Sequence, residues 1–149
     1  MPDAMDFELG SAPKSWACVP AMRTAMSRYP KASYIFFLDH TALIMDQNVS
    51  IHERFFANAV TLQIPDYPVV PPDSVIHTWE HRSPHSVYLI MARDSIGLAQ
   101  SSMLLRCGPW ATFFLDTWFD PLLRSFNFQR AEAHALVSHI IPVLDQIVE

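Results

Sequence analysis

The sequence predicts an α/β domain, and two observations support this class. The chain has 149 residues, which is the size of one domain, and 50% hydrophobic with 12% aromatic content is enough for one core. Helix-like and strand-like hydrophobic patterns then alternate along the sequence. The net charge of −5 and the lack of a Lys/Arg cluster in the sequence predict that nucleic acid is not a partner.

The first helix is expected after Pro13. Apolar residues recur at helical spacing from Trp16 to Met26, and Pro30 should end the helix because proline cannot continue the hydrogen-bond pattern. Residues 1–12 are expected to form a loosely ordered segment, and residues 13–149 to form the domain.

The run Tyr34–Leu38 is aromatic and β-branched, and it predicts a strand covered on both faces. Asp39 follows at its carboxyl end, where ligands gather in open α/β sheets. A carboxylate there is costly to bury unless it binds a metal, a sugar hydroxyl or a capping amide. Asp39 is therefore the strongest candidate for a site residue, and the alternative is that it only caps the next turn.

The middle of the chain predicts further short elements. Val49–Ala59 predicts a short helix capped by Asn48 or Ser50, and Val60–Ile64 predicts a strand. Five prolines between Pro65 and Pro84 then predict a long loop over the face of the site.

The last third predicts strands at Ser86–Ala92 and Met103–Leu105, followed by an apolar helix at Trp110–Phe119. Ala131–Val148 predicts the final helix, which Pro142 should kink or divide. One stripe of that helix is expected to carry Ala135, Leu136, His139, Ile140, Val143, Leu144 and Ile147.

Two more acidic residues are candidates for the site. Asp94 lies between two strand-like runs, so it either belongs to the same site or marks a tight turn before Gly97. Glu132 begins the final helix, where the helix dipole by itself favours a carboxylate.

Four blocks occur in a specific order: Lys14–Trp16 with Pro20–Arg23 and Tyr29-Pro30; Tyr34–Asp46; Asp94–Arg106 with Trp110 and Phe114–Trp118; and Glu132 with Ala135-Leu136. In these blocks the sequence resembles the fungal and plant Golgi glycosyltransferases of family 34. That group contains alpha-1,6-mannosyltransferases, galactomannan galactosyltransferases and xyloglucan xylosyltransferases.

The resemblance implies a GT-A-like nucleotide-sugar transferase domain, truncated at both ends relative to the family. It implies retaining transfer of mannose or galactose from GDP-mannose or UDP-galactose to a glycan acceptor, with Mn²⁺ as cofactor and a transferase complex as a further partner. It also implies residence on the lumenal side of the Golgi membrane. The sequence as given has no run of about 18 to 20 apolar residues, so by itself it is expected to be soluble.

The resemblance also implies roles for individual residues. Asp39 keeps the first carboxylate of the family's D-x-D motif, which would bind the metal or the ribose. Thr41 stands at the second position, where a neutral hydroxyl is a weaker ligand, and His40 is a candidate compensating ligand. Asp94 would position the acceptor or the sugar, and Glu132 would act near the donor.

Three further positions depart from the family's pattern. Ala99, Ser101 and Ala133 stand where the family has an asparagine, a glycine and a glutamine. An alternative function is that the chain is a noncatalytic paralogue or fragment that binds a glycan or a partner protein. The missing carboxylate at Thr41 and the truncation at both ends relative to the family favour this alternative.

Overall fold

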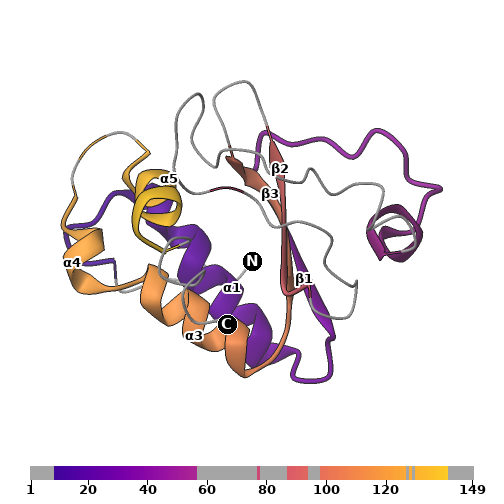
Figure 1. The fold of residues 1–149 in the computed structure, drawn as a ribbon, viewed down its shortest axis with the longest axis horizontal. Helices are drawn as coiled ribbons and strands as arrows, with labels where there is room; N and C mark the ends of the chain where they lie inside the picture. Colours follow the sequence, from indigo (N-terminus) through magenta and orange to yellow (C-terminus); the bar gives the residue numbers. More distant parts are fainter. Residues whose placement is uncertain are drawn as a thin grey trace, which may run out of the picture. The chain divides into compact units, whose positions relative to one another are not determined.

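The computed structural model describes residues 9–56, 77, 87–93, 98–126, 128 and 130–140, which contain helices and a three-stranded sheet (Figure 1). The predicted α/β class is confirmed at this level. The chain divides into two compact units, Met1–Ile35 with Leu105–Glu149 and Phe36–Leu104. Among the described residues, no helix is long and apolar enough to cross a membrane.

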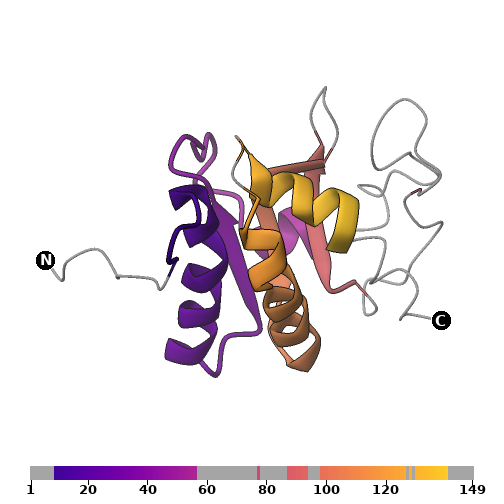
Figure 2. The same cartoon turned by 90° about the vertical axis from the view of Figure 1, so that its left-hand side faces the viewer.

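The first unit is helical. Along the chain it contains a 3₁₀ turn η1 (Lys14–Ala17), α1 (Cys18–Arg28), α3 (Pro109–Trp118), α4 (Pro121–Arg124), α5 (Ala131–Ala135) and a π-helical turn η4 (Leu136–Ile140). Helix α1 packs alongside α3, α5 packs against α4, and η4 contacts α3 (Figures 1 and 2).

The prediction for the first helix is confirmed. Trp16, Val19 and Met22 are buried on one face, as the helical spacing requires. Helix α1 ends at Arg28, and the N–H of Tyr29 closes the last turn on the carbonyl of Ala25 at 2.9 Å. The helix stops there because Pro30 follows.

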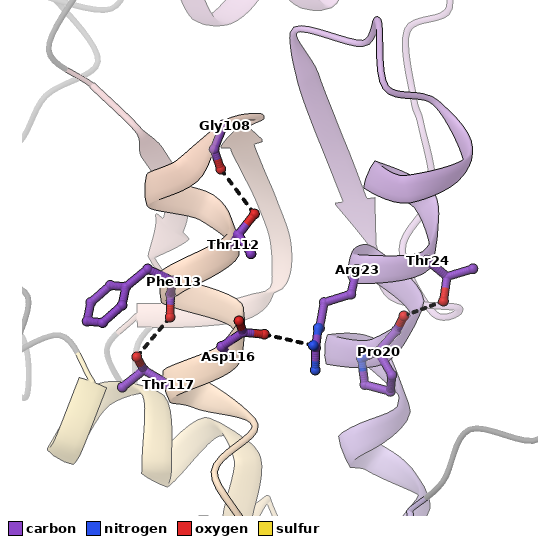
Figure 3. A network of polar contacts seen from close by, with 8 residues as sticks. All are labelled: Pro20, Arg23, Thr24, Gly108, Thr112, Phe113, Asp116 and Thr117. Carbon is purple, nitrogen blue, oxygen red and sulfur yellow. Dashed lines mark hydrogen bonds and ion pairs between the residues drawn. The ribbon is translucent and has the colours of Figure 1, made fainter.

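Helix α3 begins at Pro109, a favourable first position because proline has no N–H to leave unpaired. The Trp110 and Phe114 rings stack with centroids 5.3 Å apart, and Phe114 contacts Trp118 at 5.7 Å. On the solvent side, Arg23 of α1 and Asp116 of α3 form an ion pair at 2.9 Å (Figure 3). The buried residues of α3 are Ala111, Phe114, Leu115 and Trp118.

The final helix differs from its prediction. It is α-helical only over Ala131–Ala135 and then widens into η4. This widening falls just before Pro142, which lacks the N–H that an α-helix would donate to the carbonyl of Ser138. His139, predicted on the buried stripe, is exposed, whereas the stripe residues Ala135, Leu136 and Ile140 are buried. Residues 141–149 lie outside the described part of the chain.

The sheet has the strand order β1-β3-β2, with β1 (Tyr34–Leu38), β2 (Leu89–Arg93) and β3 (Leu98–Arg106). Strand β1 has the predicted bounds, and β2 overlaps the predicted Ser86–Ala92. Strand β3 is longer than the predicted Met103–Leu105. The polar residues Gln100 to Ser102 interrupt its apolar pattern, but the carbonyl of Ser101 still pairs with the N–H of Asp39.

Strands β1 and β3 run antiparallel. The N–H of Cys107 donates to the carbonyl of Ser33 at 2.9 Å, and the N–H of Asp39 donates to the carbonyl of Ser101 at 2.8 Å. Every residue of β1 is only partly buried. The expectation of a strand covered on both faces is therefore wrong, because antiparallel sheets do not need helices on both sides.

Within the range predicted as a short helix, Val49–Ala59, the described residues form a π-helical turn, η2 (His52–Phe56). The side-chain oxygen of Ser50 accepts a hydrogen bond from the N–H of Glu53 at 3.1 Å, so Ser50 is the cap. The Phe36 and Phe55 rings join this turn to β1, with centroids 5.8 Å apart. The strand predicted over 60–64, most of the proline-rich loop and Asp94 lie outside the described residues.

Candidate functional site

The predicted site centres on a turn that follows β1, formed by Asp39, His40 and Thr41 and called here the Asp39 turn. The N–H of Asp39 continues the sheet by donating to the carbonyl of Ser101 at 2.8 Å. The carbonyl of Asp39 accepts a hydrogen bond from the N–H of Ala42 at 2.9 Å, which closes the turn. The backbone of Asp39 is therefore fixed on both sides, by the sheet and by its own turn.

The Asp39 carboxylate uses one of its two oxygens to hold this turn. Oδ1 accepts hydrogen bonds from the N–H of Thr41 at 2.9 Å and from the Thr41 hydroxyl at 2.8 Å. The Nδ1 of His40 lies 3.0 Å from the same oxygen. Oδ2 is bonded to none of the described groups, and the Asp39 side chain is 37% exposed. This is the capping arrangement of an Asx-turn, with one carboxylate oxygen left over.

These contacts favour the charged form of Asp39. The N–H of Thr41, and then its hydroxyl, lower the pKa of Asp39 below its ordinary value of 3.8. The charge of His40 acts in the same direction, and slight burial opposes it. Asp39 is thus an ionised, partly exposed carboxylate at neutral pH.

The Mn²⁺ that the resemblance implies would need several ligands from this chain. The described residues contain no group of three or more His, Cys, Asp or Glu side chains able to hold a metal. The Thr41 hydroxyl donates to Asp39, so it is engaged where a second carboxylate would face a cation. Hard divalent cations take about six oxygen ligands, and the Asp39 turn leaves one carboxylate oxygen. The described residues therefore do not form a Mn²⁺ site by themselves.

Glu132 belongs to the first unit, and its side chain is held within that unit. It is 2% exposed, and its Oε2 accepts a hydrogen bond from the Ser15 hydroxyl at 2.7 Å. Its backbone carbonyl accepts a hydrogen bond from the indole Nε1–H of Trp118 at 2.9 Å. Both bonds connect the start of α5 to other helical elements, and the bond from Ser15 offsets part of the cost of burying the carboxylate.

The structure brings three of the predicted site residues together. His40 and Thr41, which follow Asp39 directly in the sequence, both contact its Oδ1. Asp94 lies outside the described residues. The bond between Ser15 and Glu132 was not predicted, because the two residues are 117 positions apart and no local pattern links them.

Comparison with known proteins gives a match along almost the whole chain. The model of the galactosyl transferase GMA12/MNN10 family matches residues 2–149. An uncharacterized alpha-1,2-galactosyltransferase of Schizosaccharomyces pombe is 32% identical over 91% of this chain and 42% of its own length. A second alpha-1,2-galactosyltransferase of that yeast is 26% identical over 83% of this chain and 36% of its own.

A probable alpha-1,6-mannosyltransferase of Saccharomyces cerevisiae is 29% identical over 80% of this chain and 29% of its own length. The chain thus spans less than half the length of these curated relatives. No solved structure matches the chain.

Proposed function

The chain belongs to the galactosyl transferase GMA12/MNN10 family, and from this premise we propose that it takes part in transferring a hexose from a nucleotide sugar to a glycan, with retention of configuration. The family match over residues 2–149 is the observation that carries the proposal. Relatives named for galactosyl and mannosyl transfer support mannose or galactose as the sugar, with GDP-mannose or UDP-galactose as the donor.

The proposal extends to the fold and the setting of the protein. We propose that residues 13–149 form part of a GT-A-like nucleotide-binding domain, which agrees with the mixture of helices and sheet. Residence in the Golgi lumen and assembly with another transferase follow from the family's role in glycan synthesis.

Asp39 is the proposed contact to the donor. Its carboxylate is ionised, and Oδ2 is not used by the turn. Because the described residues do not form a Mn²⁺ site alone, Mn²⁺ is proposed to bind weakly to the free protein and more tightly when a diphosphate adds its own oxygens. The imidazole of His40 is 90% exposed and is proposed as a supplementary ligand.

Two other residues are proposed to support the reaction. Asp94 is proposed to position the acceptor or the sugar, as the resemblance implies. Glu132 is proposed to act near the donor, and its burial and its bond to Ser15 favour positioning over direct contact.

The geometry of Thr41 is the observation behind one alternative function. With a hydroxyl in place of the second carboxylate, and that hydroxyl bonded to Asp39, the Asp39 turn is held without a metal. A noncatalytic domain that binds a glycan or a partner transferase would keep such a turn. This function and hexose transfer are separated by whether the chain binds a nucleotide sugar.

Isothermal titration of the purified chain with GDP-mannose and with UDP-galactose, each with and without Mn²⁺, tests the proposal. Binding of one donor that strengthens with Mn²⁺ is expected. The matched variant is Asp39→Asn, which keeps an oxygen to accept the Thr41 hydrogen bonds but removes the charge, and it should abolish the Mn²⁺ effect. A folded sample that binds neither donor would support the noncatalytic function.

A further inference from the structure

Four aromatic rings gather beside the final helix: Phe126, Phe128, His134 and His139, called here the ring cluster. The His134 and His139 imidazoles have centroids 5.7 Å apart. Phe126 and Phe128 stack on each other at 6.0 Å, and each contacts His134, at 6.4 and 5.4 Å. Phe126 also contacts His139 at 5.8 Å. Both histidines are exposed, so the cluster lies at the surface of its unit.

The two histidines meet because the helix changes its winding between them. On an α-helix, neighbouring side chains are three or four residues apart, and residues five apart point in different directions. His134 lies in α5 and His139 in the π-helical turn η4, where the hydrogen bonds span five residues. The wider turn takes His139 out of the apolar stripe and places its ring next to that of His134. Such turns are frequent at functional sites.

We propose that His134 and His139 form a two-histidine site for a divalent transition metal of the Zn²⁺ class. A zinc–nitrogen bond is about 2.0 Å long, so two imidazoles on one tetrahedral ion have ring centroids about 5 to 6 Å apart. The observed 5.7 Å falls in this interval. Water molecules supply the remaining ligands, as the exposure of both histidines allows.

The phenylalanine rings restrict the motion of the two imidazoles. A side chain that is already confined loses less conformational entropy when it binds. Phe126 contacts both imidazoles, and Phe128 contacts His134 from a second direction. The cluster therefore holds the two imidazoles near each other before the metal arrives.

This site is chemically distinct from the proposed Mn²⁺ contact of Asp39. Imidazole nitrogens bind Zn²⁺, Ni²⁺ and Cu²⁺ better than Mn²⁺, which stands lowest in the affinity order of these metals. The two-histidine site also needs no nucleotide sugar. Separate experiments therefore test the two-histidine site and the hexose-transfer proposal, and either one can fail without the other.

Titration of the full chain with ZnCl₂, in the absence of nucleotide, tests the site by calorimetry. One Zn²⁺ per chain is expected, and Mn²⁺ at the same concentrations should give no comparable heat. His134→Ala and His139→Ala should each weaken Zn²⁺ binding by at least about tenfold, because each removes one of two protein ligands. The matched control is His52→Ala, since His52 is an exposed histidine in the other π-helical turn.

Thermal unfolding gives a second readout. Zn²⁺ should raise the melting temperature of the wild type and of His52→Ala, because both keep His134 and His139 as ligands. It should not raise the melting temperature of His134→Ala or His139→Ala, which have lost one ligand. Melting without metal verifies that each variant is folded. Unchanged Zn²⁺ affinity in both His134→Ala and His139→Ala, or an equal loss in His52→Ala, would overturn the assignment.

Discussion

Thr41 donates two hydrogen bonds to the same carboxylate oxygen of Asp39, from its backbone N–H at 2.9 Å and from its hydroxyl at 2.8 Å. In a D-x-D turn with two carboxylates, the second would repel the first unless a cation lay between them. A threonine at this position replaces that repulsion with a hydrogen bond. The hydrogen bonds from Thr41 therefore hold the turn in the absence of a metal.

Replacing the Thr41 hydroxyl should raise the pKa of Asp39. Thr41→Val keeps the branched shape and the backbone N–H but removes the second hydrogen bond, so the pKa should move only part of the way toward 3.8. An NMR pH titration of the Asp39 carboxyl measures it. The control is Thr112→Val, on helix α3, which should leave this pKa where it is.

The same substitution has a consequence for stability. Because the folded pKa of Asp39 is lowered, its contribution is present above the unfolded value of 3.8 and is lost as the pH falls through the folded value. Thr41→Val should bring the folded pKa of Asp39 closer to 3.8, so the pH range over which this contribution to stability is lost should become narrower. An identical acid unfolding profile in the variant would contradict the role given to the hydroxyl.

Restoring the second carboxylate should create metal affinity. Thr41→Asp adds a second anionic oxygen ligand next to Asp39 and should tighten Mn²⁺ binding at least about tenfold, because affinity for hard cations rises with ligand charge. Without Mn²⁺ the variant should be less stable at neutral pH, since two carboxylates then lie close together. Calorimetry and thermal unfolding with and without Mn²⁺ measure both effects. Thr41→Asn is the matched neutral control and should show neither.

If Thr41→Asp binds Mn²⁺ and also hydrolyses a nucleotide sugar, the rest of a transferase site persists in this chain. Tight metal binding without any donor hydrolysis would instead show that the Asp39 turn was repaired but that other parts of the site are missing.

The fold was predictable where one segment carried its own pattern. Trp16, Val19 and Met22 show the helical spacing of α1, and Pro30 marks its end. Strand β3 was predicted too short because Ser101 and Ser102 are polar, and what makes them strand residues is pairing with a partner strand. The prediction that His139 lies on the apolar stripe was wrong, because that prediction assumed α-helical spacing and His139 lies in a π-helical turn.

The candidate site was predictable only in part. Asp39 was found from its place after an apolar strand, and the capping alternative describes what its Oδ1 does. Whether its Oδ2 also binds a ligand stays a prediction. The partner of Glu132 could not be found, because a hydrogen bond between residues 117 positions apart depends on the packing of whole helices.

Gly108 should be sensitive to any side chain. It precedes α3 with φ 152° and ψ −174°, a backbone conformation that is almost restricted to glycine. The space around an added Cβ is open, so Gly108→Ala tests the backbone alone. It should lower the free energy of unfolding by about 1 to 3 kcal/mol in denaturant titrations.

The control for Gly108 is Thr112→Ala, one turn into the same helix. It removes a methyl group at an exposed position and the hydroxyl, whose hydrogen bond to the Gly108 carbonyl is 3.3 Å long (Figure 3). A change within about 0.5 kcal/mol is expected there. If Gly108→Ala were equally mild, the strained conformation assigned to this residue would be wrong.

The hydrogen bond between Ser15 and Glu132 should stabilise the first unit. Ser15→Ala leaves a buried carboxylate with one donor fewer and should lower the free energy of unfolding by about 1 to 3 kcal/mol. The control is Ser27→Ala, at an exposed position of α1, where alanine should be neutral or slightly stabilising. Denaturant titration measures both variants.

Glu132→Gln then separates a structural role from a role at the donor. The amide keeps the size of the side chain and an oxygen that can accept a hydrogen bond from Ser15, so much of the stability should remain. Because the two residues are in contact, the changes in unfolding free energy of Ser15→Ala and Glu132→Gln should not add up in the double variant. If Glu132 only positions α5, the affinity for a nucleotide sugar should stay close to that of the wild type. A large loss of donor affinity in a variant of near-normal stability would instead establish direct contact with the donor, despite the burial of this residue.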